Sequence, residues 1–129
     1  MAALDTNVLV RYIVRDDARQ LLAARRLFQK CIDGGQTLYV PVTVTIELEW
    51  VLRSNFGFDK AEVIEIFSQL LSTTELCFAS EGAVEHALSA YSKSAADFAD
   101  CLHVALAGES PLWTFDKGAS KVDGASRLA

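Results

Sequence analysis

Four acidic side chains occupy positions typical of a reactive site. Asp5 and Asp116 each follow a short apolar run, whereas Glu47 and Asp100 interrupt segments with helical spacing of apolar residues. Ligands bind at the carboxyl ends of the strands in open α/β sheets, so we expect the two strand-end acids to share one edge. Several carboxylates in one cleft repel one another, and a divalent cation removes that repulsion. An all-oxygen ligand set predicts Mg²⁺ or Mn²⁺, and the lack of a His/Cys cluster argues against zinc.

The segment that carries Asp100 is apolar on nearly all sides, which predicts a buried helix over residues 98–107. Ser94 and Asp97 fit a capping box at its start, so Asp97 has a structural explanation and Asp100 has none. His103 lies one turn after Asp100. We expect this histidine to be a hydrogen-bonded core residue rather than a ligand.

Helical spacing distinguishes two glutamates in the helix expected after Pro41, up to about Arg53. Glu47 has apolar neighbours one turn away and is predicted to face inward, where a carboxylate is costly unless it is paired or metal-bound. Glu49 lies beside Arg53 and is predicted to face outward. The alternatives are that Glu47 lies at the edge of the apolar stripe and is solvated, and that Asp5 only caps the following helix.

A divalent-metal site of this kind predicts hydrolysis of a phosphodiester, because the metal orients the substrate, activates water and stabilises the leaving oxygen. No Lys or Arg is expected to face inward among the acids. Thr6, Asn7 and Thr114 flank the strand-end acids and are expected to donate hydrogen bonds to carboxylates, metal-bound waters or phosphate oxygens. The alternative is that they only cap helices and form turns.

Charge is unevenly distributed along the 129 residues, whose net charge is −5. Residues 54–129 hold the acidic excess, and residues 1–53 hold slightly more basic than acidic side chains. Arg11, Arg15 and Arg19 would lie near one helical face if their segment were a continuous helix, which predicts contacts with phosphates. A solvated helix face is the alternative.

The pattern of elements predicts one α/β domain over residues 1–129, with a central, mostly parallel sheet of four to five strands covered by helices. The expected strands are residues 2–4, 37–40, 75–79, 112–115 and 125–128. The first of these is predicted to be buried. No transmembrane or signal segment is evident, and three separated cysteines in apolar surroundings suit reduced thiols, so a cytoplasmic protein is expected.

Four motifs, in this order and at these separations, resemble the PIN-domain nucleases, and among them the toxins of VapBC-type toxin–antitoxin pairs. The motifs are Leu4-Asp5-Thr6-Asn7-Val8-Leu9, the segment Ile46–Arg53 around Glu47, Ala96-Asp97-Phe98-Ala99-Asp100, and Thr114-Phe115-Asp116. The resemblance implies a three-layer α/β/α fold around five parallel strands and a Mg²⁺- or Mn²⁺-dependent ribonuclease. It also implies a homodimer and an antitoxin whose basic segment blocks the acidic cleft.

Carried over residue by residue, the resemblance implies roles for eight side chains. Asp5, Glu47, Asp100 and Asp116 match the metal-binding acids, Asp97 matches an auxiliary acid, and Thr6, Asn7 and Thr114 match supporting polar positions. The chain departs from the family pattern at Cys101 and His103, where small or aliphatic residues are more usual, and it is short after Asp116.

Two other functions fit parts of the pattern. A phosphatase of the haloacid dehalogenase type also places an Asp after its first strand, but it requires a second Asp two residues later, where this chain has Asn7. A non-catalytic module that binds RNA or an antitoxin would use the same fold. The intact set of four acids favours the nuclease over both.

Overall fold

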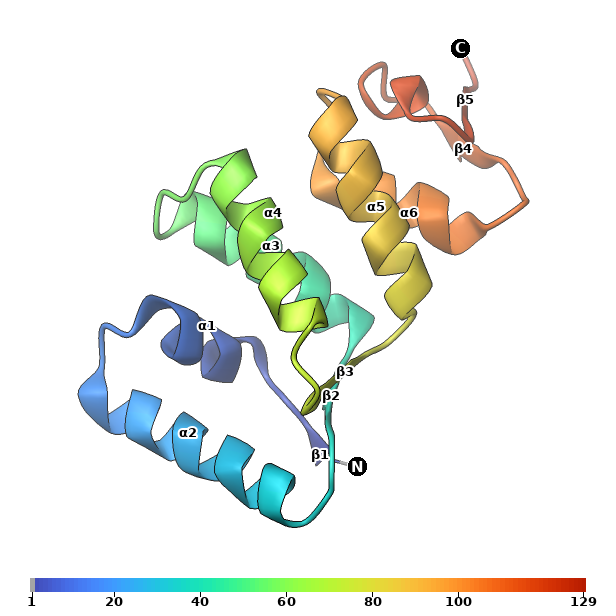
Figure 1. Ribbon diagram of the computed structural model, residues 1–129. Coiled ribbons are helices and arrows are strands. Elements are labelled where there is room, and N and C mark those ends of the chain that lie inside the picture. The colour runs from blue at the N-terminus through green and yellow to red at the C-terminus, as the bar shows by residue number, and fades with distance from the viewer. Residues whose placement is uncertain (1) are drawn as a thin grey trace. The chain divides into compact units, whose positions relative to one another are not determined.

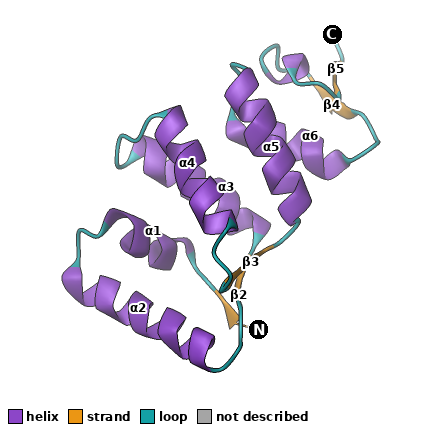
Figure 2. Cartoon of the chain, viewed as in Figure 1, coloured by secondary structure: helices purple, strands orange, loops and turns teal. Residues whose placement is uncertain are grey.

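The computed structural model describes residues 2–129 and divides the chain into two compact units, residues 1–79 and residues 80–129 (Figure 1). The α/β architecture expected from the sequence is confirmed, because helices are interspersed with short parallel strands along the chain (Figure 2). The single functional domain expected from the sequence stays a prediction. No helix in the described residues is both long and apolar enough to cross a membrane.

The N-terminal unit contains a three-stranded parallel sheet with four helices between and after its strands. Its elements are β1 (Ala2–Ala3), α1 (Thr6–Val14), α2 (Ala18–Asp33), β2 (Leu38–Val40), α3 (Val42–Ser54), α4 (Lys60–Leu71) and β3 (Leu76–Phe78). The strand order is β1-β2-β3, with Ala3 opposite Tyr39 and Tyr39 opposite Cys77. The prediction that the first strand is buried is wrong, because β1 is an edge strand of two exposed alanines.

The core of this unit forms where the helices pack on the sheet, and apolar side chains from both make it up. The fully buried members are Leu9, Leu38, Val40, Leu48, Leu52, Val63 and Phe67. Helix α2 contributes Phe28 and Cys31 to the buried set, whereas Leu22 and Ile32 on the same helix are 48% and 50% exposed. The apolar side chains of α2 therefore extend beyond the surface that this unit covers.

Helices α1 and α2 are separate because the chain breaks between them. Arg15 follows α1 in the left-handed conformation, with φ 61°, and its N–H donates to the carbonyl of Arg11. Asp17 then caps α2 by accepting from the N–H of Gln20 at 3.0 Å, as its position predicts. The condition for one basic helical face is therefore not met, because Arg11, Arg15 and Arg19 do not share a helix, and contact of these residues with phosphates stays a prediction.

The C-terminal unit pairs two helices with a small sheet. It contains α5 (Glu81–Lys93), α6 (Phe98–Ala107), β4 (Leu112–Thr114), the 3₁₀ helix η1 (Ala119–Lys121) and β5 (Ala125–Arg127). Tyr91 of α5 meets Phe98 of α6 edge to face, with ring centroids 5.6 Å apart. Strands β4 and β5 are parallel, so the described residues hold five parallel strands, arranged as sheets of three and two.

The start of α6 differs from the capping box that the sequence predicts. Ser94 is the C-cap of α5, and its hydroxyl accepts a hydrogen bond from the N–H of Ala96. Asp97 is itself the N-cap of α6, and its side chain makes no capping hydrogen bond. The helix begins three residues later than the box requires, and the carboxylate of Asp97 is therefore not engaged in a capping hydrogen bond.

Candidate functional site

Asp5 stands between β1 and α1, where the sequence places it. It is the N-cap of α1, and its Oδ1 accepts from the N–H of Thr6 at 2.7 Å. The side chain is nevertheless exposed. Capping and ligand binding are thus compatible at this position, because one carboxylate oxygen has several lone-pair sites and the second oxygen is not used by the cap.

Asp5 and Glu47 line one cleft in the N-terminal unit. The cleft has a volume of about 420 Å³, and its lining also includes Thr6, Asn7 and Asn55. Glu47 reaches it from α3, Asp5 from the β1–α1 connection, and Thr6 and Asn7 from the first turn of α1. The structure therefore brings together two of the four acids and two of the three polar residues that the sequence singles out.

The predicted orientation of the two glutamates on α3 is wrong. Glu47 is exposed, whereas Glu49 is 4% exposed and accepts from Nε of Arg53 at 2.9 Å. The buried face of α3 runs along Thr45, Leu48 and Leu52, and Glu49 lies beside that face. The four-residue spacing of an acid and an arginine was the signal for this ion pair.

Thr6 has a buried hydroxyl that forms no hydrogen bond in the described residues. The residue is 4% exposed, and its Oγ1 is buried without a hydrogen-bond partner in the described residues. A buried hydroxyl in this state costs free energy, about 1–3 kcal/mol. Because Thr6 lines the same cleft as Asp5, a ligand or water in the cleft would satisfy it.

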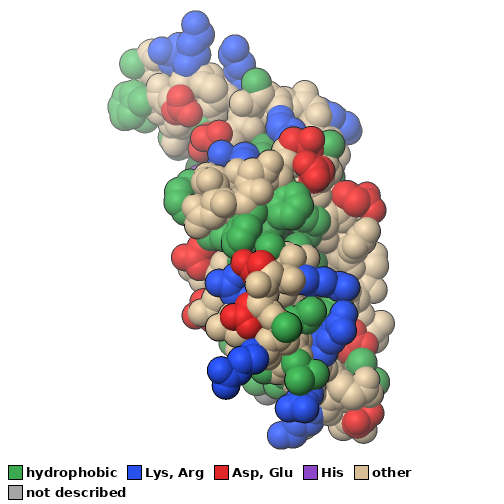
Figure 3. Space-filling view, turned by 90° about the vertical axis from the view of Figure 1, so that its left-hand side faces the viewer, with side chains coloured by type: hydrophobic (Ala, Val, Ile, Leu, Met, Phe, Trp, Pro, Cys, Tyr) green, Lys and Arg blue, Asp and Glu red, His purple; other side chains and the backbone are tan. Residues whose placement is uncertain are grey.

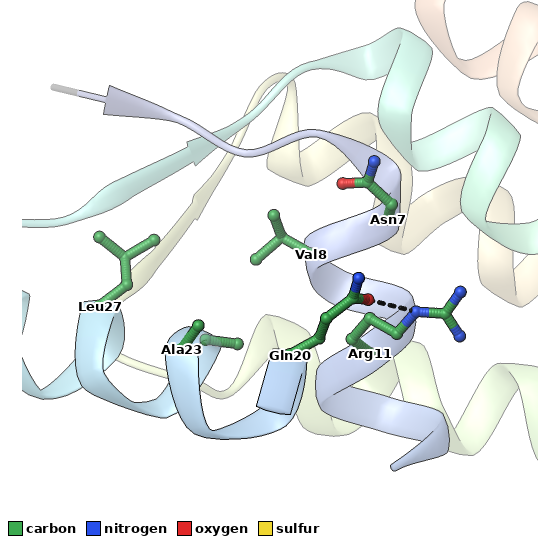
Figure 4. A pocket seen from close by; sticks show the side chains of 7 residues that line it. Asn7, Val8, Arg11, Gln20, Ala23 and Leu27 are labelled. Carbon is green, nitrogen blue, oxygen red and sulfur yellow. Dashed lines mark hydrogen bonds between the residues drawn. The ribbon is translucent and has the colours of Figure 1, made fainter. Parts of the chain in front are cut away.

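Arg11 lines the acidic cleft as well, contrary to the prediction that no cation faces the acids. Its Nη1 donates to both carboxylate oxygens of Asp16 at 2.8 and 2.9 Å, and its Nε donates to Gln20 at 2.7 Å (Figure 4). Arg11 lies one turn after Asn7 on α1, so helical spacing could have revealed it. The guanidinium is held by its partners between α1 and α2.

The other two arginines lie outside the cleft lining. Arg15 is exposed and donates from Nε to the carbonyl of Tyr12, and Arg19 is exposed on α2. On the face that Figure 3 shows, basic side chains are interspersed with acidic ones. This face therefore carries mixed charge rather than a continuous basic patch.

The C-terminal unit contains a second acidic group, made of Asp97, Asp100 and Asp116. Asp97 and Asp116 are exposed, and Asp100 is half-buried in the first turn of α6. Burial, followed by the negative charges of Asp97 and Asp116, raises the pKa of Asp100, and His103 opposes this rise. The charges of Asp97 and Asp116 therefore disfavour the ionised form of Asp100. His103 is exposed, so its predicted place in the core is wrong.

Asp116 is fixed by the turn that follows β4. Its carboxylate accepts from the N–H groups of Gly118 and Ala119 at 3.3 and 3.2 Å, and its own N–H donates to Oγ1 of Thr114 at 3.0 Å. Thr114 thus acts in the turn, which was the alternative to donating to a ligand. The turn holds the backbone of Asp116 at the end of the strand.

The two acidic groups suit a hard divalent cation in their chemistry, because carboxylate and hydroxyl oxygens are the atoms that Mg²⁺ and Mn²⁺ bind. A bound cation would also remove the repulsion that raises the pKa of Asp100. Within residues 2–129, however, no group of three or more His, Cys, Asp or Glu side chains is arranged to hold a metal ion. Each unit by itself therefore offers a partial set of ligands.

Comparison with known proteins identifies the class. The family model of the PIN domain matches residues 2–125, so this chain belongs to the PIN domain family. Among individual relatives, the chain is similar to a VapC ribonuclease from Aquifex aeolicus (strain VF5), with 26% identity over 102 residues. The match covers 79% of this chain and 75% of the relative. Membership of this family favours the nuclease over the phosphatase alternative.

Proposed function

We propose that this protein is a divalent-metal-dependent endoribonuclease that hydrolyses RNA phosphodiester bonds and acts as a toxin. The observation that carries the proposal is the cleft, in a chain of the PIN family, that Asp5 and Glu47 line together with Thr6, whose buried hydroxyl has no hydrogen-bond partner in the described residues. Carboxylate and hydroxyl oxygens are the atoms that Mg²⁺ and Mn²⁺ bind. The name of the relative, a VapC ribonuclease, supports RNA as the substrate.

The residues proposed to hold the metal are Asp5, Glu47, Asp100 and Asp116, with Asp97 as an auxiliary acid. When bound, Mg²⁺ or Mn²⁺ would align the phosphodiester, activate water and stabilise the leaving oxygen. It would also allow a polyanion to approach an acidic surface, because it offsets the carboxylate charges. Glu47 and Asp97 suit this role because both are exposed and, among the described residues, neither carboxylate accepts a hydrogen bond or forms an ion pair.

The neighbouring polar groups are proposed to position substrate and ligands. The free Oγ1 of Thr6 can donate to a phosphate oxygen or a carboxylate, and Asn7 can donate from its amide into the same cleft. Thr114 acts through the turn, by fixing the backbone of Asp116. Arg11 is proposed to keep its ion pair with Asp16 in the free protein and to limit the net negative charge of the cleft.

The partners proposed for this protein are an antitoxin with a basic segment and a second copy of the chain. Residues 80–129 carry seven acidic and four basic side chains, a balance that suits a basic inhibitor. The cytoplasmic location expected from the sequence remains a prediction.

A non-catalytic PIN module is the second candidate, because no group of three or more His, Cys, Asp or Glu side chains in residues 2–129 is arranged to hold a metal ion. An RNA cleavage assay separates the two functions. Purified protein is incubated with a mixed RNA pool, with Mg²⁺ or with EDTA, beside the variant Asp5→Asn. The nuclease predicts cleavage that requires the metal and is lost in the variant, whereas binding without cleavage would establish the module.

A further inference from the structure

A polar pocket of about 300 Å³ lies within the C-terminal unit, apart from the lining of the acidic cleft. Four of its residues come from α5 and the others from the segment after α5 and from the end of η1. The lining is His86, Ser89, Ala90, Lys93, Ser94, Lys121, Val122 and Asp123. Two ammonium groups, an imidazole and two hydroxyls therefore surround one space, and nothing in the function proposed above uses them.

The charge of this pocket runs against that of its surroundings. Residues 80–129 carry four Lys or Arg side chains against seven Asp or Glu, and two of the four basic side chains, Lys93 and Lys121, line the pocket. Both lysines are exposed, and within residues 2–129 neither ammonium group forms an ion pair or a hydrogen bond. Asp123 offsets one of the two charges at most. The pocket thus keeps a net positive charge, on two ammonium groups that have no ion-pair partner in the described residues.

The walls of the pocket continue directly into both segments that carry the acids of this unit. Ser94 precedes Asp97 by three residues, and Lys121 follows Asp116 by five through η1. The backbone of Ser120 donates to the carbonyl of Asp116 at 3.0 Å, which ties η1 to the acid-bearing turn. A group bound in the pocket would therefore lie next to the segments that deliver Asp97 and Asp116.

We propose that this pocket binds a phosphate of the RNA backbone beside the cleavage site, and so positions the substrate. The inference rests on the function proposed above. Lysine ammonium groups and hydroxyls are common partners of phosphate oxygens, and contacts of this kind fix the register of a nucleic acid without reading its sequence. Because the phosphate is bound by charge, the contribution of the pocket decreases as salt increases.

The test compares the double variant Lys93→Gln/Lys121→Gln with the control Lys30→Gln, which removes an exposed positive charge from α2. Binding of a labelled single-stranded RNA is measured by fluorescence anisotropy over a range of salt concentrations, in the Asp5→Asn background with Mg²⁺ so that RNA is not cut. The double variant is expected to bind about tenfold more weakly at low salt, with a slope of log K against log salt reduced by about 0.7. The control is expected to keep the parent slope.

RNA cleavage provides a second measurement. It is assayed for the parent protein, the double variant and the control, each without the Asp5→Asn substitution. A rise in KM with kcat changed less than twofold is expected of a positioning subsite. An unchanged slope and KM in the double variant would overturn the subsite while leaving the nuclease intact. A protein that binds RNA with the expected slope change but cuts none would instead overturn the proposed activity and keep the subsite.

Inorganic phosphate distinguishes the backbone of RNA from a free anion. It is titrated into the parent protein and the double variant by calorimetry. A free-phosphate site would bind phosphate tightly in the parent, lose it in the variant and leave the RNA slope unchanged, and that result would overturn the proposal. Weak phosphate binding together with the slope change supports it.

Discussion

The acidic side chains of the two units have different electrostatic surroundings. In the N-terminal unit, Asp5 and Glu47 share their cleft with the guanidinium of Arg11, which Asp16 and Gln20 hold in place. In the C-terminal unit, burial and the charges of two neighbouring acids raise the pKa of Asp100. The first arrangement limits the electrostatic cost within the protein, and the second leaves it for a ligand to remove. We therefore expect a bound cation to affect the C-terminal acids more than the N-terminal ones.

The largest expected effect is the loss of RNA cleavage when one acid from either unit is neutralised. We expect Asp5→Asn and Asp116→Asn each to lower kcat/KM by about 10³-fold, because each removes a ligand from the same chemistry. Groups that act together give non-additive losses. The double variant Asp5→Asn/Asp116→Asn should therefore lose about as much kcat/KM as either single variant. Cleavage of a defined RNA with Mg²⁺ measures all three.

Asp33→Asn serves as the matched control for these variants, because Asp33 is an exposed acid at the end of α2 and accepts a hydrogen bond from Gln29. It should cut RNA at the parent rate. If Asp116→Asn abolished cleavage and Asp5→Asn did not, the C-terminal acids alone would carry the activity, and the proposed common role of the two units would be wrong.

Glu47 and Glu49 offer a second test within one helix. We expect Glu47→Gln to reduce cleavage by about 10²-fold at an unchanged free energy of unfolding, because the side chain is exposed and lines the cleft. Glu49→Gln should lower the free energy of unfolding by about 1–3 kcal/mol, because it weakens the buried contact with Arg53. Urea denaturation and cleavage assays distinguish the two.

The reverse result would be informative. Loss of activity without loss of stability in Glu49→Gln would show that the buried glutamate reaches the reaction, and the assignment of Glu47 as a ligand would then be wrong.

Sequence reasoning worked where local pattern determines structure and failed where packing does. Asp5 and Asp116 lie at strand ends as predicted, because short apolar runs followed by polar residues define both elements. The orientation of Glu47 could not be derived, since apolar neighbours occur on both flanks of α3 and only the packed core selects its buried face. The position of Asp97 depended on a helix start that differed by three residues from the expected one.

Gly57 and Gly124 allow the two units to be compared for their tolerance of an added methyl group. A Cβ at Gly124, where φ is 103°, would lie 2.8 Å from Cγ1 of Val104, whereas Gly57, with φ 70°, has no atom within 4 Å of that position. We expect Gly124→Ala to lower the free energy of unfolding by about 2 kcal/mol and Gly57→Ala by about 1 kcal/mol. Urea denaturation measures both losses. Adding Val104→Ala should restore part of the stability lost in Gly124→Ala and none of the stability lost in Gly57→Ala. Equal losses in the two variants, with no rescue, would mean that backbone conformation alone sets the cost.

The smallest effect concerns the repulsion at Asp100. Because its pKa is raised in the folded state, the folded protein keeps this proton to a higher pH than the unfolded chain does, and stability therefore falls as pH rises through the folded-state value. Asp100→Asn removes that fall, so its thermal midpoint in EDTA should exceed that of the parent by about 1–3 °C at neutral pH and converge with it in acid. Mg²⁺ should raise the midpoint of the parent more than that of the variant, because the parent gains relief from repulsion as well as a ligand. A variant less stable than the parent at neutral pH would mean that the carboxylate of Asp100 stabilises α6, and the contrast between the two units would then disappear.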